Sequence, residues 1–426
     1  MDGRTRTLFG HPPGLVVLFT TQMWAEFSFF GLQALLVYYM TKQLGFAQAQ
    51  SSLIYGAYGA AAFFSPFVGG FIADRWLGRT ASVISGGVMM MFGHFAMAFP
   101  ALLFPALALV AIGNGLFIPP LAIQVGGLYA DDDPRKAYAY SAYYMGINLG
   151  GLLAPFVCGT LGELYGWHWG FAAAGVGMGI GLAIYCSCLR FLPPEPSRSA
   201  IAREEKPAAA LVIRRDVSVL VLMIAMVVLF RVGYEQSGNV IALWVSDFTD
   251  RSINLLGKDV TVPATWFQSI NPLLIILGTP VLIRIWRARR AKETTPNLLR
   301  RMAIGCVIAA AAMLVMVLAA LASGSTGARV SSLWVVFYFV LLTLGELLVI
   351  PTGLTLIESL APVRFASMTM GAWYIAKFLG SLFAGFMGAY WLVIPAWQFF
   401  CLGAGSTIVA AVSLYSMARL LGPKFQ

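Results

Sequence analysis

Long apolar runs separated by short polar segments make up most of this chain. Windows of about 19 residues reveal membrane-spanning helices by their mean hydropathy, and here they predict twelve spans. Each span approaches or exceeds the roughly 20 residues that a membrane helix needs. The predicted spans are residues 14–40, 50–73, 82–98, 101–128, 138–162, 168–190, 217–246, 264–286, 302–322, 332–358, 366–391 and 396–418. The pattern therefore predicts an all-α membrane protein with 12 transmembrane helices.

The composition supports this prediction and sets the orientation. The chain is 59% apolar and 11% charged, whereas a soluble domain is roughly 25% charged. With both termini in the cytoplasm, 22 of the 28 Lys and Arg residues lie on the cytoplasmic side, four lie outside and two lie within spans. This bias follows the positive-inside rule and explains the net charge of +10 without a nucleic-acid partner. Arg outnumbers Lys by 21 to 7, and this ratio favours a bacterial source. We therefore expect the protein in a plasma membrane that is a bacterial inner membrane.

One long polar stretch, residues 191–216, divides the spans into six and six. Its Pro, Ser, Ala and mixed charges are typical of a cytoplasmic linker. We therefore expect an N-terminal six-helix bundle at 1–191, a linker at 192–216 and a C-terminal six-helix bundle at 217–426.

The two halves share short motifs. Residues 113–119 read GNGLFIP against GELLVIP at 345–351, and residues 149–154 read LGGLLA against LGSLFA at 379–384. Chance matching in helices rich in Gly, Leu and Ala is the alternative to a duplicated unit. A duplication predicts two pseudo-symmetric bundles with a cavity between them near the membrane midplane.

Five ionisable residues lie inside the apolar runs: Glu26, Arg231, Glu235, Glu346 and Lys377. Each costs at least about 2.5–3.5 kcal/mol at a helix centre, so such groups usually face an interior cavity and have a function. The simplest interpretation is a membrane transporter with several membrane-spanning helices. The sequence shows no catalytic triad, metal-ligand spacing or phosphate loop, so we expect no enzyme activity, no cofactor and no metal.

Helical spacing places several of these groups together. Gln22, Glu26, Phe29, Phe30 and Gln33 follow one stripe of the first span. Arg231 and Glu235 are four residues apart, so one helical turn can hold them as a pair. We expect Glu26, Arg231 and Glu235 to form a network between the halves, because a lone buried charge is prohibitive. A static salt bridge that only holds helices together is the alternative.

The cytoplasmic turn after the second span reads Gly70-x-x-x-Asp74-Arg75-x-x-Gly78-Arg79. Its acid and bases can pair with each other and with a neighbouring helix end, which would latch one gate conformation. This turn resembles the signature loop of the major facilitator superfamily, and an ordinary positive-inside turn is the alternative.

Nearly the whole chain resembles the proton-dependent oligopeptide transporter (POT) family of that superfamily. The strings that carry the resemblance are Phe27-Ser28-Phe29-Phe30-Gly31, Gly69-Gly70-Phe71-Ile72-Ala73-Asp74-Arg75, Gly146-Ile147-Asn148-Leu149-Gly150, Glu235-Gln236, Trp266-Phe267-Gln268-Ser269-Ile270-Asn271-Pro272 and Leu344-Gly345-Glu346. Trp373 falls where the family has a cavity tryptophan. The resemblance implies the two-bundle fold, proton coupling and a peptide substrate.

Several positions depart from the family pattern. The Glu-x-x-Glu-Arg motif of the first helix is here Gln22-Met23-Trp24-Ala25-Glu26, and the cations expected in the first and fourth helices are Gln33 and Ile118. The cavity tyrosines are replaced by Phe29, Phe30 and Phe64, the usual tryptophan of the seventh helix by Arg231, and the first of two adjacent acids by Tyr234. This is a non-canonical member of the family.

The resemblance implies that Glu346 receives a substrate amino group, and a paired structural role is the alternative. The place of Lys377 in the eleventh span indicates that it pairs with Glu346 or binds a substrate anion, and snorkelling from a helix-packing crevice is the alternative. Gln22, Glu26, Phe29, Phe30, Gln33, Phe64, Asn148, Arg231, Tyr234, Asn271, Glu346, Trp373 and Lys377 are the expected substrate-binding residues. Glu26, Arg231, Glu235 and Glu346 are the expected proton-coupling or gating residues, and Asp74, Arg75 and Arg79 form the expected latch. Pro119, Pro272 and Pro351 are expected to bend their helices.

These observations favour a proton-coupled secondary transporter that moves a small peptide or peptide-like solute by alternating access. An exporter or facilitator of another amphipathic metabolite or drug is one alternative, and a substrate sensor without transport is another. The expected partners are the solute, protons and membrane lipid, and the chain is expected to act as a monomer.

Overall fold

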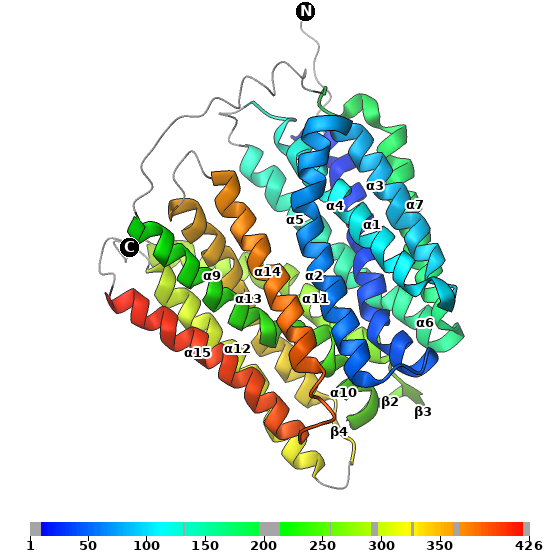
Figure 1. Cartoon of the computed structure of the whole chain (residues 1–426), viewed down its shortest axis with the longest axis vertical. Coiled ribbons are helices and arrows are strands. Elements are labelled where there is room, and N and C mark those ends of the chain that lie inside the picture. The colour runs from blue at the N-terminus through cyan, green and yellow to red at the C-terminus, as the bar shows by residue number, and fades with distance from the viewer. Residues whose placement is uncertain are drawn as a thin grey trace, which may run out of the picture. The chain divides into compact units, whose positions relative to one another are not determined.

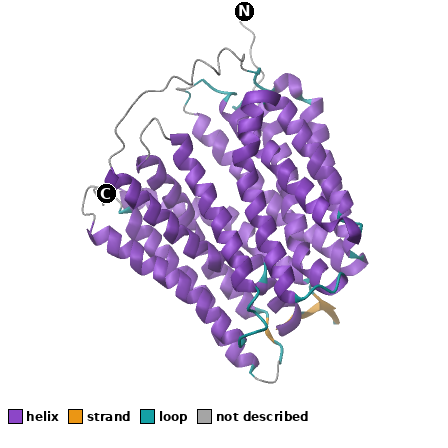
Figure 2. Cartoon of the chain, in the orientation of Figure 1, coloured by secondary structure: helices purple, strands orange, loops and turns teal. Residues whose placement is uncertain are grey.

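Helices form almost the whole of the computed structural model, which describes residues 10–130, 133, 135–195, 214–255, 257–290, 297–324, 328–360 and 366–420 (Figures 1 and 2). The α-helices are α1 Pro13–Tyr38, α2 Gln48–Ile72, α3 Arg79–Ala96, α4 Leu103–Gly126, α5 Arg135–Ala154, α6 Thr160–Tyr165, α7 Trp167–Ser187, α9 Arg214–Tyr234, α10 Val240–Phe248, α11 Ile270–Arg290, α12 Leu298–Ser323, α13 Leu333–Leu360, α14 Ala366–Gly388 and α15 Ala396–Leu420. Every predicted span coincides with one of these helices or with a short series of them.

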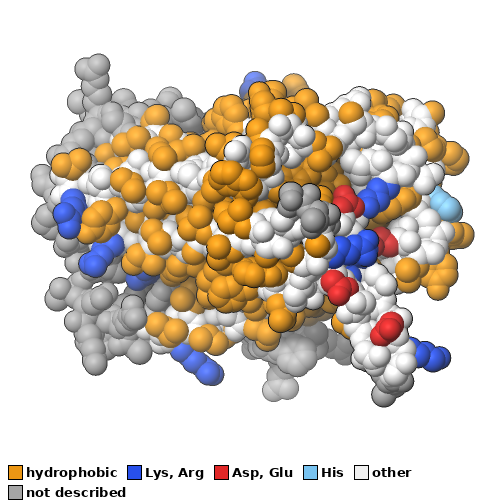
Figure 3. All heavy atoms as spheres, turned by 90° about the horizontal axis from the view of Figure 1, so that it is seen from below, with side chains coloured by type: hydrophobic (Ala, Val, Ile, Leu, Met, Phe, Trp, Pro, Cys, Tyr) orange, Lys and Arg blue, Asp and Glu red, His pale blue; other side chains and the backbone are white. Residues whose placement is uncertain are grey.

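Ten helical segments in the described residues are long and apolar enough to cross a membrane. The other two predicted spans, 82–98 and 366–391, are occupied by α3 and α14. The end of the molecule seen in Figure 3 carries apolar side chains together with several charged ones. Many large apolar side chains are exposed along the helices themselves. Such a surface suits contact with lipid rather than with water.

Two of the predicted spans are interrupted. The fifth runs from α5 through the π-helical turn Pro155–Gly159 (η4) into α6. The seventh runs from α9 through the 3₁₀ turn Glu235–Gly238 (η6) into α10, and Asn239 separates the two with non-helical backbone angles, φ −108° and ψ −95°. Interrupted membrane helices are found where they line a binding site or are buried in protein.

Two of the three prolines lie in the interior of their helices. Pro119 falls inside α4 and Pro351 inside α13. Pro272 lies in the first turn of α11, directly after the 3₁₀ helix Ala264–Ser269 (η7), and the bending of the three helices stays a prediction. In a first turn, the missing proline N–H removes no helical hydrogen bond.

Short strands in the loops are absent from the sequence prediction. The strands β1 (Thr249–Asp250) and β4 (Val330–Ser331) pair in parallel, with Thr249 opposite Val330. The strands β2 (Ser252–Leu255) and β3 (Lys258–Thr261) form an antiparallel hairpin, with Ser252 opposite Thr261. These strands follow α10 and precede α13 in the chain, so they connect spans rather than form a core.

The chain forms two compact units. The first contains residues 1–36 and 61–207, and the second contains residues 37–60 and 208–426. The partition into bundles at 1–191 and 217–426 stays a prediction, and the contacts group residues 37–60 differently because these pack on helices of the second half. Of the predicted linker, residues 196–213 lie outside the described part of the chain.

In the first unit, α3 packs along α4 and also contacts α7. Val83, Met90, Phe117, Met178 and Tyr185 are all fully buried in this core. Glycines allow the close approach, since a Cβ added at Gly113 would lie 2.6 Å from the carbonyl oxygen of Gly86.

The second unit contains the matching pair of helices, α12 and α13, with α15 packed on α12. A Cβ added at Gly345 would lie 2.7 Å from the carbonyl oxygen of Gly305. Gly113 and Gly345 begin the two matching motifs of the sequence, and each is the contact point of its helix with the preceding span. The shared packing role supports a duplicated six-helix unit.

Candidate functional site

The first unit holds a buried polar cluster built on α1 and α5. Gln22 donates a hydrogen bond from Nε2 to Glu26 Oε1 at 2.7 Å, and the hydroxyl of Tyr143 donates to Gln22 Oε1, also at 2.7 Å. Glu26 is 8% exposed and Gln22 1% exposed. The four-residue spacing on α1 predicts the first contact, whereas Tyr143 comes from a distant part of the chain and is missing from the prediction. In this cluster the Glu26 carboxylate is joined to the hydroxyl of Tyr143 through the amide of Gln22.

The other predicted residues of the first unit lie in different surroundings. Phe29 is buried and packs edge-on against the half-buried Phe30. Asn148 is buried and donates to the carbonyl of Tyr144 in its own helix. Gln33 is half-buried, while Phe64 is 47% exposed on α2 with its ring 6.2 Å from that of Phe67. A shared substrate role for these residues stays a prediction.

In the second unit, Arg231 and Glu235 form a buried ion pair at the end of α9. This is the pair that the four-residue spacing predicts. The guanidinium also lies over the ring of Tyr234, with its Cζ 5.3 Å from the ring centre. Glu235 begins the 3₁₀ turn that interrupts the seventh span, so the ion pair lies at the break in the helix.

Glu346 on α13 is held by neutral polar groups. The Tyr234 hydroxyl lies 3.1 Å from Oε1, and Asn271 donates from Nδ2 to Oε2 at 2.7 Å. The same amide nitrogen lies 3.0 Å from the hydroxyl of Thr343, which itself donates to the carbonyl of Phe339. Glu346 is only 7% exposed, and both its oxygens are hydrogen-bonded, as a buried carboxylate requires.

The cation Lys377 lies on α14 close to this group. Its Nζ is 5.5 Å from the ring centre of Tyr374, and its positive charge, like that of Arg231, acts on the Glu346 carboxylate. Trp373, one turn earlier, is buried with its ring edge against Gly353 of α13. Four helices, α9, α11, α13 and α14, therefore carry the predicted residues of the second unit, with Glu235 in the turn after α9.

The repeat relates Glu26 to Arg231. Gly150 and Gly380 occupy the same place in the second pair of matching motifs. A Cβ added at Gly150 would meet the backbone of α1 and lie 3.1 Å from Cβ of Glu26, whereas one added at Gly380 would lie 2.5 Å from Cβ of Arg231. Each half thus places a charged residue beside the equivalent glycine, with opposite signs in the two halves. The predicted network joining Glu26 to Arg231 and Glu235 stays a prediction, because its members belong to different units.

Residues 37–60 are bound to the second unit by polar contacts. Lys42 Nζ contacts Ser246 Oγ and lies 2.9 Å from Asp247 Oδ1, and the Tyr38 hydroxyl donates to the carbonyl of Ala242 at 2.7 Å. These groups are absent from the predicted site. Their signal in the sequence is weak, since Lys42 and Asp247 read as ordinary charges at the ends of two spans.

A second set of contacts joins the same segment to the break in the seventh span. Ser52 donates to Asn239 Oδ1 at 2.9 Å, and Gln48 donates to Ser52 and to the carbonyl of Gly388 at 2.7 and 2.9 Å. Gly56 also meets Gly385 of α14 backbone to backbone. The non-helical residue Asn239 is therefore held by α2.

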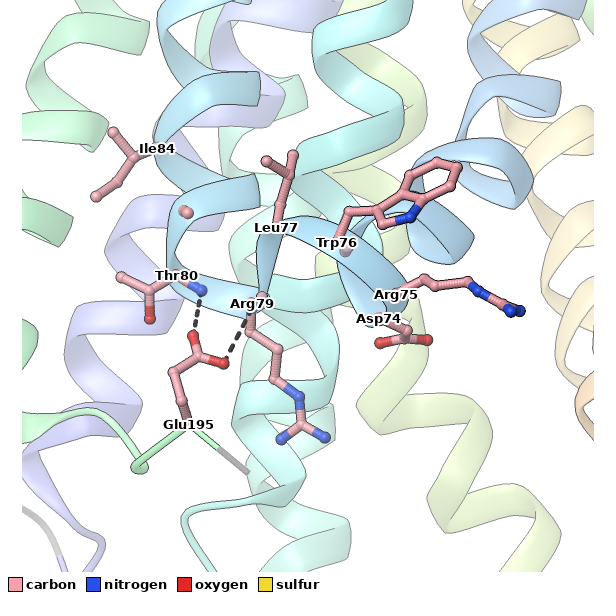
Figure 4. A pocket seen from close by; sticks show the side chains of 11 residues that line it. Asp74, Arg75, Trp76, Leu77, Arg79, Thr80, Ile84 and Glu195 are labelled. Carbon is pink, nitrogen blue, oxygen red and sulfur yellow. Dashed lines mark hydrogen bonds between the residues drawn. The ribbon is translucent and has the colours of Figure 1, made fainter. Parts of the chain in front are cut away.

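The predicted latch residues line a cavity of about 430 Å³ at the turn between α2 and α3 (Figure 4). Asp74 lies in the π-helical turn Ala73–Leu77 (η2), and no ion pair joins it to Arg75 or Arg79 within the described ranges. The carboxylate of Glu195 instead accepts from the backbone N–H groups of Arg79 and Thr80, at 3.1 and 2.5 Å. An acid at a helix N-terminus satisfies otherwise unpaired N–H groups.

Burial raises the pKa of the Glu195 carboxyl, but the hydrogen bonds from Thr80 and Arg79 and the Arg79 charge outweigh burial and hold this pKa below its ordinary value. A lowered pKa means that the stabilising contribution is complete above the ordinary value and is lost as the pH falls through the lowered one. Glu195 is absent from the predicted latch because it lies 116 residues from Arg79 in the sequence.

In the part of the chain that the structure describes, no three His, Cys, Asp or Glu side chains are grouped so that they could hold a metal ion. The polar groups described above are carboxylates, amides, hydroxyls and cations. They are suited to binding a charged organic solute and to exchanging protons.

Comparisons with known proteins agree with the fold and with these groups. The Major Facilitator Superfamily matches residues 18–385. A di-/tripeptide transporter of Lactococcus lactis subsp. cremoris is 31% identical over 439 residues, which cover 87% of this chain and 88% of that protein. The peptide transporter YePEPT of Yersinia enterocolitica subsp. palearctica is 32% identical over 460 residues, which cover 90% of this chain and 89% of that protein.

Solved structures give the same result. A peptide transporter POT in complex with sulfate has a TM-score of 0.88 at 28% identity, covering 98% of this chain and 96% of that one. A POT family transporter in complex with 5-aminolevulinic acid has a TM-score of 0.88 at 25% identity, covering 98% of each chain. The family resemblance and the all-α membrane fold are confirmed. This chain belongs to the Major Facilitator Superfamily and, within it, to the POT family of transporters.

Proposed function

We propose that this protein couples the movement of protons to that of a small peptide or peptide-like solute, by alternating access across the bacterial inner membrane. The observation that carries the proposal is the buried Glu346 carboxylate, held by Tyr234 and Asn271 in the second unit. Its two hydrogen-bond partners are neutral, and although the charges of Arg231 and Lys377 also act on this carboxylate, it can form a charge-assisted hydrogen bond with the ammonium end of a zwitterionic solute.

Lys377 is the candidate for the opposite end of the solute. The cations that the family uses in the first and fourth helices are Gln33 and Ile118 here, and Lys377 lies on the span that also carries Trp373. A cation and a carboxylate on neighbouring helices match the two charged ends of a short peptide. The family relatives named as di-/tripeptide transporters, and the neighbour bound to 5-aminolevulinic acid, support a solute of this kind.

Glu26 is the candidate for the coupling proton. Its carboxylate is buried in the first unit and accepts a hydrogen bond from the neutral amide of Gln22. Arg231 and Glu235 supply a charge pair at the helix break of the second unit. Protonation of a carboxylate that faces such a pair would loosen it, and this is the proposed gate.

The remaining parts of the proposal concern topology. Both termini would lie in the cytoplasm. The turn that carries Asp74, Arg75 and Arg79 would lie on the same side and act as the latch. The protein would act as a monomer. The positive-inside distribution of Lys and Arg supports this orientation.

Thermal-shift measurements combined with counterflow test the proposal. Purified protein is screened with di- and tripeptides against other amphipathic metabolites, and every ligand that stabilises it is tested for counterflow in liposomes. We expect a di- or tripeptide to raise the melting temperature and to exchange across the bilayer. Binding without counterflow would favour a sensor, and counterflow of a metabolite other than a peptide would favour the alternative transporter.

A further inference from the structure

The second unit contains a groove with a volume of about 360 Å³ between α11, α12 and α13. Its described lining consists of Leu, Ile, Val and Gly residues, with Thr343 as the single polar member. None of the described lining residues is charged, so the groove matches an uncharged, flexible chain. A methylene group is about the size of a water molecule, which takes up roughly 30 Å³. The volume of the groove therefore accommodates about a dozen methylene groups.

The helix on one side of this groove has unusually little protein around it. In the most apolar window of Ala264–Ile285, only 17% of the residues are buried, against 44% or more in the other nine candidate spans of the described chain. Leu277 and Val281, which line the groove, are 60% and 55% exposed. A membrane-spanning helix with this much bare apolar surface needs a lipid chain to cover it.

A positive charge lies beside one end of the groove, the end that the positive-inside distribution of Lys and Arg assigns to the cytoplasm. Arg284 is exposed on α11, one turn beyond Val281 and two turns beyond Leu277, so the three residues share one helix face. Ile285, next to this arginine, is the last residue of α11 to line the groove. A guanidinium beside the end of an apolar groove matches the phosphate of a lipid whose chain lies within it.

We propose that this groove binds a phospholipid of the cytoplasmic leaflet, with one acyl chain between α11 and α13 and its phosphate at Arg284. The groove also shares a wall with the candidate transport site. Thr343 lines it and lies 3.0 Å from the Asn271 nitrogen that donates to Glu346. The bound acyl chain therefore packs against Thr343, which positions the Asn271 amide that donates to Glu346. The lipid site itself does not depend on the identity of the transported solute.

Photolabelling in liposomes tests this site. The probe is a phospholipid with a photoreactive diazirine near the middle of one acyl chain, and the labelled residues are mapped by mass spectrometry. We expect the segments 274–285 and 340–348 to be labelled severalfold more than the exposed apolar face of α15 around Val412, which is 61% exposed. Equal labelling of the groove and of that face would overturn the site.

Two groove-filling variants, Leu344→Trp and Leu277→Trp, keep the test independent of any one helix, since both side chains are exposed in the groove. Each should reduce groove labelling several-fold, whereas Leu318→Trp, at an exposed position of α12 outside the groove, should leave it unchanged. Unchanged groove labelling in both filling variants, with the proteins still folded, would contradict the proposal.

The phosphate contact is tested with Arg284→Gln and a second probe, a diacylglycerol that carries the same photoreactive chain. The substitution should lower labelling by the phospholipid but not by the diacylglycerol. An equal effect on both probes, or none on either, would remove Arg284 from the site.

Discussion

At the scale of single residues, each buried charged side chain in the described part of the chain has a polar partner. Glu346 has a hydrogen bond to each oxygen, Glu26 accepts one from Gln22, and Arg231 contacts Glu235. An isolated charge would be prohibitive in this environment. The proposed roles in solute binding and proton transfer require these polar partners to rearrange.

Glu26→Gln should abolish accumulation driven by a pH gradient while leaving counterflow close to that of the wild type. Glutamine keeps a side chain of the same shape that can hydrogen-bond to Gln22, but it cannot be protonated reversibly. The measurement is uptake and counterflow of the same ligand in liposomes. Wild-type accumulation in this variant would remove Glu26 from the coupling mechanism.

Lys377→Met should weaken binding of a ligand with a carboxylate far more than binding of its amide. A hydrogen bond to a charged group contributes about 1.5–3 kcal/mol, which corresponds to roughly tenfold or more in Kd. Lys377→Arg, which keeps the charge, is the matched control and should bind both ligands. Equal losses for the acid and the amide in Lys377→Met would show that the lysine does not bind the anion.

Residue spacing predicts only the contacts that lie within one helix. The pairs Gln22–Glu26 and Arg231–Glu235 follow from positions four apart. Tyr143 and Thr343 are missing from the prediction because each reaches its partner from another helix, and Tyr and Thr are common in spans that have no function. Fold-level packing, which hydropathy does not encode, brings them to the site.

At the scale of helices, close glycine contacts determine how the spans pack. A Cβ added at Gly69 of α2 would overlap the carbonyl group of Gly115 in α4. The glycines of the family-like string at 69–75 thus have a packing role as well as a place in the latch turn. Small residues at such crossings allow backbones to approach within a membrane.

Gly69→Ala should destabilise the protein, because the methyl group meets backbone atoms that cannot rotate away. Overpacking of this kind costs about 1–3 kcal/mol, and the apparent melting temperature in detergent should fall by several degrees. Gly405→Ala is the control, since nothing lies within 4 Å of its added Cβ and alanine favours a helix by about 1 kcal/mol. A melting temperature equal to or above that of the wild type in Gly69→Ala would contradict the packing.

Hydropathy located the spans well because a membrane helix must be both long and apolar. It did not resolve the break in the seventh span, since windows of this length average over a few residues. The local signal was present, as Ser237, Gly238 and Asn239 form a cluster typical of turns. The two-residue strands β1 and β4 carry no such signal, and their pairing joins segments 81 residues apart.

At the scale of the whole molecule, residues 37–60 have the contacts that a gate requires. They belong to the first half by sequence but pack with the second unit through Lys42, Tyr38 and Ser52. Alternating access between two bundles requires these contacts to break in part of the cycle.

A reducible crosslink between Lys42→Cys and Asp247→Cys should stop exchange but still allow ligand binding. The exposed native Cys186 and Cys401, and the half-buried Cys188, are first replaced by Ser. Counterflow should be lost with a short bifunctional thiol reagent and return when the linker is cleaved, and either single-cysteine variant is the control. Full counterflow in the crosslinked protein would show that these contacts do not open during transport.

The measurement closest to the central claim is uptake of a labelled dipeptide into liposomes that contain the purified protein, with and without an inward proton gradient. Coupled transport predicts accumulation above the external concentration only while the gradient lasts, and its collapse when a protonophore is added. The same internal level with and without the gradient would contradict proton-coupled peptide transport by this protein.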